Sequence, residues 1–341
     1  MLILYTGGEM KLSTIAINLR PFTLDDSQEV VDLFNAYSRA LQGQDQFDLD
    51  DLITDWTSPG MNIAEAVRVL ENTQGKIIGY IDVWDTTKPH VTKYIWGLMH
   101  PDHWNKEQYH AMLTWAEAFS RERIHLAPEG TRVCMSQGVS NNDMRRKKAL
   151  EAYGFAVVRH FYQMEIELDD APLSPTVPEE IAIVPIDVNT ELKTALIAMD
   201  DGFKDHWGHV DRPIDEVLDQ WQHFLKNDKD FDPSLWYLAK SGEEIAGVCR
   251  CNPKTVEDPN MGWINQLCVR KPWRRQGLGK ALLLTAFNEF YRRGKQRVGL
   301  SVDAASLTNA THLYEKAGMQ VTKQYDTYEM ELRPGKELAT S

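Results

Sequence analysis

LCVRKPWRRQGLGKALLL, residues 267–284, is the stretch that decides the fold of this chain. The apolar, β-branched run from Ile264 to Val269 predicts a strand. The apolar period of 3.6 residues that begins at Leu278 predicts a helix ending near Gly294. Between them lies a tight turn with two glycines, 277–279, and a group of basic side chains surrounds it: Arg270, Lys271, Arg274, Arg275 and Lys280. Free N–H groups, glycines, a helix dipole and positive charge are what a pyrophosphate requires. The stretch therefore predicts an anion site, and a solvated basic turn without a ligand is the alternative.

Two further elements follow at a fixed order along the chain. A second strand spans Val298 to Asp303, and a short helix then carries the pattern Ala310-x-x-Leu313-Tyr314-x-x-x-Gly318-Met319. With Arg274-x-x-Gly277-x-Gly279, these motifs give residues 180–333 a pattern that resembles the GNAT (Gcn5-related) N-acetyltransferase superfamily. In that family the glycine turn holds the pyrophosphate of acetyl-CoA, and the late element supplies a tyrosine. The resemblance implies acetyl-CoA as the acyl donor.

The composition is that of a folded, acidic protein. The 341 residues are 43% hydrophobic and carry a net charge of −13, which excludes disorder and disfavours binding to nucleic acid or to an anionic membrane. We find no run of 18 apolar residues and no secretion signal, so we expect a cytoplasmic protein. The sequence leaves open whether it is a monomer or a homodimer. The four cysteines lack zinc spacing and are expected to fill the core. Residues 1–16 carry no clear element, and either Met1 or Met10 is the native start.

The order of elements occurs twice. Similar segments recur in the two halves: Lys76–Tyr80 with Glu244–Val248, Arg132–Ser136 with Arg297–Ser301, Tyr153–Phe155 with Ala317–Met319, and Gln163–Leu168 with Tyr328–Leu332. Two long copies indicate a duplicated domain. We therefore expect an α/β protein with two tandem GNAT folds, each a mixed, mostly antiparallel twisted sheet flanked by helices. Residues 17–169 form the first, a proline-containing linker spans 170–180, and residues 181–333 form the second.

The glycine turn and the tyrosine are not duplicated. At the positions that match Arg274, Gly277, Gly279 and Tyr314, the first half has Trp104, Glu107, Tyr109 and Leu150. Glutamate and tyrosine remove the glycine turn, and a glutamate opposes an anion. No Gly-x-Gly occurs between residues 97 and 130. We expect the first half to have kept the fold and lost the diphosphate site. This plan resembles mycothiol synthase and its tandem relatives.

The resemblance also implies how the donor is held. Backbone groups of Leu267 and Val269 would pair with the pantetheine arm, and N–H groups of residues 275–280 would hold the pyrophosphate. A backbone N–H near Cys268 or Val269 would meet the oxyanion. Ser306 replaces the asparagine that the family often has eight residues before its tyrosine. The expected donor-binding residues are Leu267, Cys268, Val269, Arg274, Arg275, Gln276, Gly277, Leu278, Gly279, Lys280, Ser306 and Asn309.

The motif predicts Tyr314 as the general acid, since a phenol can protonate a leaving thiolate; a half-buried core tyrosine is the alternative. The base is less defined, because Asn265 and Gln266 stand where the family often has a glutamate. Asp303 is one candidate, although it also suits a helix cap. His206, in the segment Asp205-His-Trp-Gly-His209, is the other. We expect the acceptor to contact Asp205, Trp207 and Asn265. The two histidines have no further ligand at suitable spacing for a metal.

These residues predict an acetyl-CoA-dependent N-acetyltransferase that acts on the amine of a small molecule by direct transfer, with only the second half active. Three alternatives stay open. The chain could be a non-catalytic acyl-CoA sensor, could acetylate a cysteinyl amino-sugar as mycothiol synthase does, or could acetylate basic protein tails.

Overall fold

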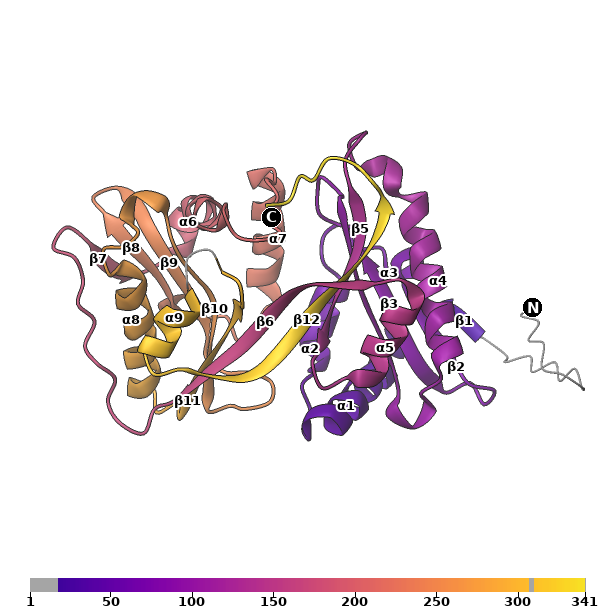
Figure 1. Cartoon of the computed structure of the whole chain (residues 1–341). Coiled ribbons are helices and arrows are strands. Elements are labelled where there is room, and N and C mark those ends of the chain that lie inside the picture. The colour runs from indigo at the N-terminus through magenta and orange to yellow at the C-terminus, as the bar shows by residue number, and fades with distance from the viewer. Residues whose placement is uncertain (1–17, 307–309, 341) are drawn as a thin grey trace, which may run out of the picture.

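The computed structural model describes residues 18–306 and 310–340, so the expectations about residues 1–16 and about Asn309 lie outside the described residues. The described strands form one continuous mixed sheet of 12 strands, in the order β1-β2-β3-β4-β5-β12-β6-β11-β10-β9-β8-β7 (Figure 1). Helices cover both faces in each half of the molecule. This is the mixed α/β architecture that the sequence predicts. Among the described residues, no helix has both the length and the apolar character needed to cross a bilayer.

The strands have the bounds β1 Asn18–Pro21, β2 Val67–Glu71, β3 Ile77–Trp84, β4 Thr92–Met99, β5 Val133–Ser140, β6 Ala156–Glu167, β7 Ala182–Pro185, β8 Trp236–Ser241, β9 Glu244–Asn252, β10 Met261–Val269, β11 Arg297–Asp303 and β12 Gln320–Arg333. The helices have the bounds α1 Ser27–Gln42, α2 Leu49–Trp56, α3 Ile63–Ala66, α4 Lys106–Glu122, α5 Met144–Tyr153, α6 Val188–Phe203, α7 Ile214–Asn227, α8 Leu278–Arg292 and α9 Ala310–Lys316.

The two halves exchange their last strands. The sequence analysis places β6 at the end of the first half and β12 at the end of the second, but β6 pairs with β11 and β12 pairs with β5. Over the middle of the molecule the two strands also pair with each other, antiparallel. In Figure 1 they form the long ribbon that connects the two halves. The boundaries at 169 and 181 therefore divide the sequence, whereas the sheet of each half contains a strand from the other.

Buried side chains show why the exchanged strands are needed. Tyr328 of β12 is 0% exposed and packs in the core of the first half, under α4 and α5. Met164 of β6 is 0% exposed and packs in the core of the second half, under α8 and α9. On the opposite faces, α1 and α2 cover the first half and α6 and α7 cover the second. Each core is thus complete only when the other half supplies its strand.

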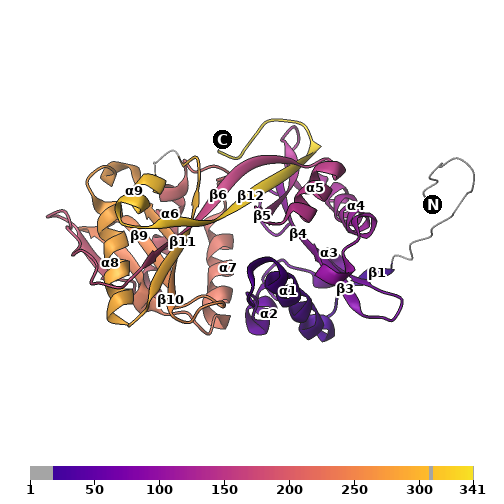
Figure 2. The ribbon, with the colours of Figure 1, turned by 60° about the horizontal axis from the view of Figure 1, so that its bottom comes forward.

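The sequence analysis missed two helices, α2 and α7, of which α7 borders the site. Helix α7 carries an apolar stripe, formed by Ile214, Val217, Leu218, Trp221 and Leu225, that packs on the sheet beside α6. It also faces the first half, where the His223 imidazole lies 3.3 Å from the carbonyl oxygen of Thr54 in α2. Figure 2 shows α7 facing α2 of the first half. The helix therefore forms one wall of the space between the halves.

Met164→Ala tests whether the halves fold as one unit. We expect the substitution to lower the free energy of unfolding by about 2–5 kcal/mol, because it leaves a cavity in the second core. Chemical denaturation should show one transition that shifts as a whole, since the shared strands couple both halves. Val158→Ala on the same strand, where the side chain is 40% exposed, should change stability by less than about 0.5 kcal/mol. Two separate transitions, of which only one moves, would contradict this coupling.

Candidate active site

The second half contains a wedge between two parallel strands. β10 and β11 pair only from Met261 to Ile264, opposite Arg297 to Leu300. Beyond that point β10 has a bulge between Ile264 and Gln266, and bulges bend the strand that carries them. The strands then separate and enclose a cavity of about 800 Å³. We call it the β10–β11 cavity; it is lined by Ile264–Val269, Leu300–Asp303, the α8 turn, Tyr314 of α9 and the loop after α6.

The open edge of β10 presents backbone groups to this cavity. Arg270 donates its N–H to Ala246 of β9, and successive residues of a strand direct their polar groups to opposite sides. Leu267 and Val269 therefore direct their N–H and C=O groups away from β9 and into the wedge. The Val269 carbonyl accepts a hydrogen bond from the Arg274 side chain at 2.8 Å. An extended ligand could add to the remaining groups as a further strand.

The N-terminus of α8 opens on the same cavity. Gly277 precedes the helix with φ +84°, a left-handed conformation that favours glycine, and gives the helix no side-chain cap. The first helical bond runs from Ala281 to Gly277, so the N–H groups of the first turn have no intrahelical partner. Arg275 also adopts a positive φ, +63°. Among the described residues, no hydrogen bond or ion pair is found for the side chains of Arg275 and Lys280. The turn thus combines free donors with uncommitted positive charge.

Arg274 has a different position from its neighbours. Its guanidinium pairs with the Asp205 carboxylate at 2.5 and 3.0 Å and donates to the carbonyl of Gly202. The ion pair lowers the pKa of Asp205. Asp205, which we expected to contact an acceptor, therefore connects the glycine turn to the end of α6. The charge of Arg274 is paired in this contact, so Arg274 stabilises the turn and is not a free cation.

Tyr314 is buried, with 6% exposure, yet lines the β10–β11 cavity. Its ring packs in the core while its position reaches the wedge, and its role as the general acid stays a prediction. Burial raises the pKa of Tyr314 above its ordinary value, so the hydroxyl keeps its proton at neutral pH. Cys268 lies close by, and burial raises the pKa of its thiol to about 12. The Cys268 thiol is thus protonated and a poor nucleophile at neutral pH.

The candidate bases differ in their surroundings. Asp303 binds Arg159 of β6 through both oxygens, at 2.9 and 2.8 Å, and also accepts from the N–H of Ala305. Both oxygens are therefore committed, which argues against Asp303 as a base. The His206 imidazole lines the cavity, and no hydrogen bond to another described side chain is found for it. Burial lowers its pKa, so the neutral form that a base requires is favoured.

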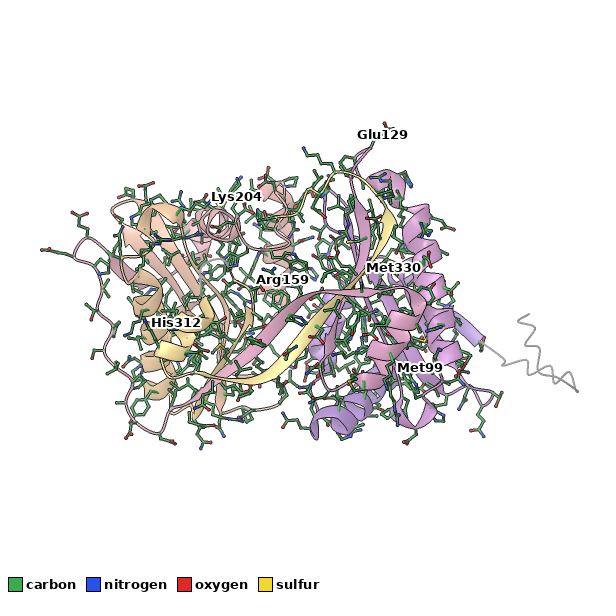
Figure 3. All side chains as sticks on the ribbon, viewed as in Figure 1. Met99, Glu129, Arg159, Lys204, His312 and Met330 are labelled. Atoms are coloured by element: carbon green, nitrogen blue, oxygen red, sulfur yellow. The ribbon has the colours of Figure 1, made fainter. Side chains whose placement is uncertain are left out.

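Strand β6 brings first-half residues into the site, which the sequence analysis missed. Phe161 lines the cavity and lies 6.3 Å from the Trp207 ring, measured between centroids. The Arg159 guanidinium lies 5.6 Å from the centre of the same ring. Figure 3 labels Arg159 where β6 passes between the halves. Trp207, expected to contact the acceptor, is thus fixed between groups of the exchanged strand.

The other predicted residues divide into two groups. Asn265 stands at the bulge and lines the cavity, and its buried Oδ1 has no hydrogen-bond partner among the described residues. Leu278, Gly279 and Ser306 also line the cavity. Gln276 does not, because its exposed side chain turns back to the carbonyl of Pro272 at 3.2 Å.

The fold gives His209 neighbours that sequence spacing did not reveal. Asp200 at the end of α6 and Asp211 in the following loop lie 3.7 and 3.5 Å from its Nε2. The three possible ligand atoms lie within 4.8 Å of one another. However, the Asp211 side chain is 77% exposed, and structural zinc sites take four ligands. The contacts of His209 hold the loop to the end of α6. Backbone hydrogen bonds between Thr340 and residues 208 and 209 connect the same loop to the C-terminal segment.

The matching region of the first half is closed. Helix α4 is capped by the Asn105 side chain, which accepts from the N–H of Gln108 at 2.9 Å. Gly277 and Asn105 are the residues that precede α8 and α4, so they correspond in the structure. The comparison of the two halves in sequence instead paired Gly277 with Glu107, two residues later. Strand β4 pairs with β3 without a bulge. Helix α5 carries Arg146, 3% exposed, which donates to Gln137 of β5. Side chains therefore fill the region that is open in the second half.

A second cavity, of about 620 Å³, lies between the halves and shares Ser301 with the β10–β11 cavity. Its wall has seven carboxylates, Asp51, Asp55, Glu165, Asp228, Asp230, Glu257 and Asp258, against three basic residues, Lys254, Arg297 and Lys323. Lys254 pairs with Asp230 and Arg297 with Asp258, so the wall keeps a net negative charge. Burial, followed by the nearby Asp51 charge, raises the pKa of Asp55 to about 6. Such a wall attracts cations.

Comparison with known proteins agrees with this geometry. Residues 198–319 match the model of the acetyltransferase (GNAT) family. The second half contains a GNAT domain. A GCN5-related N-acetyltransferase from Sphaerobacter thermophilus is similar over 95% of this chain and 98% of its own, at 28% identity and a TM-score of 0.77. A search of curated protein sequences found no significant match.

More distant structures share the tandem fold. A tandem GNAT protein from the clavulanic acid biosynthesis pathway is similar over 94% of this chain and all of its own, at 14% identity and a TM-score of 0.70. The N-myristoyltransferase of Saccharomyces cerevisiae, solved with bound myristoyl-CoA, is similar over 96% of this chain and 80% of its own, at 8% identity and a TM-score of 0.61. The fold is thus a tandem GNAT fold. The family assignment indicates an acyltransferase that uses a CoA-linked donor.

The acidity of His206 can be measured without any assumption about substrate. We expect NMR titration of its ring protons to give a pKa below the ordinary value of about 6.5, because burial disfavours the imidazolium. The His206 ring packs against Phe203 with centroids 4.8 Å apart. Phe203→Ala admits water there and should raise the pKa towards the ordinary value. A pKa at or above that value in the wild-type protein would refute the effect of burial.

Proposed function

We propose that the chain is an acetyl-CoA-dependent N-acetyltransferase, that the second half alone binds the donor, and that the acetyl group passes directly to the amine of a small molecule. The observation that carries the proposal is the meeting of the β10–β11 wedge with the uncapped N-terminus of α8. An extended pantetheine arm matches the wedge, and a pyrophosphate matches the α8 turn with Arg275 and Lys280. The filled wedge and capped helix of the first half support a single donor site.

The residues of the cavity support direct transfer. The amine nitrogen forms a bond to the thioester carbon, a backbone N–H of β10 stabilises the oxyanion, and the carbon–sulfur bond then breaks. Tyr314 gives a proton to the departing sulfur, and the proton of the attacking nitrogen leaves to His206, directly or through water. An acyl-cysteine intermediate is disfavoured, because the Cys268 thiol holds its proton. The acidic wall next to Ser301 supports a cationic amine as the acceptor.

Calorimetric titration with acetyl-CoA tests the donor site. The wild-type chain should bind one equivalent, and Gly277→Glu should weaken binding by at least about 100-fold, or ~2.7 kcal/mol. The new carboxylate opposes the pyrophosphate, and the left-handed backbone is strained by about 1–2 kcal/mol. Gly294→Glu is the matched control: at the other end of α8 it has a similar φ, +74°, and open space around it. Two equivalents would mean that the first half also binds, and no binding would refute the proposal.

Tyr314→Phe tests the acid and separates an enzyme from an acyl-CoA sensor. We expect kcat, measured as release of the CoA thiol with an amine panel, to fall by about 10²–10⁴-fold. The affinity for acetyl-CoA should stay the same, because only the hydroxyl is lost. Tyr237→Phe is the control, since Tyr237 is equally buried in the same core but does not line the cavity. Equal rates for the two variants would remove Tyr314 from the chemistry, and acetyl-CoA binding without turnover of any amine would favour the sensor.

A further inference from the structure

Arg250 is a buried cation without a carboxylate partner. It lies on β9 with 6% exposure, and among the described residues no ion pair involves it. The two other buried cations of the described chain each have one: Lys93 lies 2.6 Å from Asp85, and Arg146 lies 3.9 Å from Asp143. An uncompensated charge costs several kcal/mol to bury. A position that keeps such a charge is a candidate for function.

The surroundings of Arg250 hold it in place without an ion pair. The charge of Asp228 favours the guanidinium, but among the described residues no hydrogen bond or ion pair joins the two side chains. Its Nε donates to the side-chain oxygen of Gln266, and one Nη donates to Asn252 at 3.3 Å. The rings of Trp221 and Phe224 lie 5.0 and 5.8 Å from the guanidinium carbon. Of the five N–H donors of an arginine, three have no partner among the described residues. Burial lowers the pKa of Arg250 to about 10, so it is still charged at neutral pH.

The guanidinium faces a pocket between the two halves. This Arg250 pocket has a volume of about 370 Å³, and its wall comes from β9, β10 and α7 of the second half and from residues near Thr86 and Pro59 of the first. Apart from Arg250 and His223, the lining side chains are uncharged. An anion in this pocket would therefore meet the guanidinium without a competing carboxylate on the wall.

The Arg250 pocket is close to the place where the acyl group would lie. Arg250 is paired with Gln266 in the β9–β10 ladder, directly at the bulge. Gln266 lines both the Arg250 pocket and the β10–β11 cavity. Neighbouring strands lie about 5 Å apart. A small molecule bound to Arg250 can thus place a second group in the wedge, if that group lies only a few bonds from the one that Arg250 binds.

We infer that Arg250 binds a carboxylate of the acceptor, so that the substrate class is a small amino acid-like molecule whose amine enters the wedge beside Gln266. This inference rests on the proposed function. A carboxylate matches the planar fork of an arginine through two parallel hydrogen bonds. A single cation with neutral surroundings suits one negative charge, whereas a phosphate dianion is better matched by two cations.

The first experiment compares matched acceptor pairs in the wild-type chain and in Arg250→Met, which keeps an apolar stem of similar length. The pairs are glycine and glycinamide, β-alanine and β-alaninamide, 4-aminobutyrate and its amide, and phenylalanine and its amide, with release of the CoA thiol as the signal. For at least one pair, kcat/KM for the acid should exceed that for the amide by 100-fold or more. Arg250→Met should remove most of this preference, and Lys226→Met, an exposed cation on α7, should leave it unchanged. A preference for amides, or an acid preference that survives in Arg250→Met, would overturn the inference.

Thermal unfolding gives a readout that needs no turnover. Arg250→Met should melt at a temperature at least as high as the wild-type chain, because it removes an uncompensated buried charge. Sodium propionate should raise the melting temperature of the wild type, relative to sodium chloride at equal ionic strength, and should do so less for the variant. A variant that melts lower and shows the same response to propionate would make Arg250 structural and would overturn the inference. The affinity for acetyl-CoA should be equal in the wild type and in Arg250→Met. A wild-type chain that does not bind acetyl-CoA would refute the proposed function instead of this inference.

Discussion

Backbone pairing between β6 and β12 joins the two halves, and the site of the second half depends on it. Each strand leaves the segment in which it is encoded and completes the sheet of the other half. The exchange buries Met164 in one core and Tyr328 in the other. It also carries Arg159 and Phe161 to the β10–β11 cavity, where they fix Asp303 and Trp207. The proposed acceptor side of the site is therefore built by both halves, whereas the proposed donor side comes from the second half.

The elements of the proposed donor side are local structure, and for that reason the sequence predicts them. A strand, a glycine turn and a helix start lie within 30 residues, and the turn requires a positive φ that Gly277 adopts at little cost. The cavity that the structure shows is lined by most of the residues expected to bind the donor. A local sequence motif does not reveal which distant residues its side chains contact, however. Arg274 belongs to the motif by spacing, yet its charge is committed to Asp205, 69 positions away.

The rest of the fold depends on contacts that sequence patterns do not encode. The alternation in β6 is the same whether it pairs with β5 or with β11, so the exchange could not be predicted from the strand itself. Helix α7 lacks a glycine stop and a polar N-cap, since Pro213 and Asp228 flank it, and its stripe was overlooked. In the sequence, Arg250 is a single polar residue between Cys249 and Cys251 of a predicted strand. Only the three-dimensional arrangement shows that it is buried without a carboxylate partner in the described part of the chain.

The exchange of strands has a consequence for how such a chain can change over generations. After a duplication, a copy that has lost its ligand site is ordinarily free to be deleted. Here a deletion of the first copy would remove β6 and leave β12 without the sheet that it completes. The two halves can thus diverge in chemistry but cannot be separated, because each supplies a strand that the sheet of the other requires.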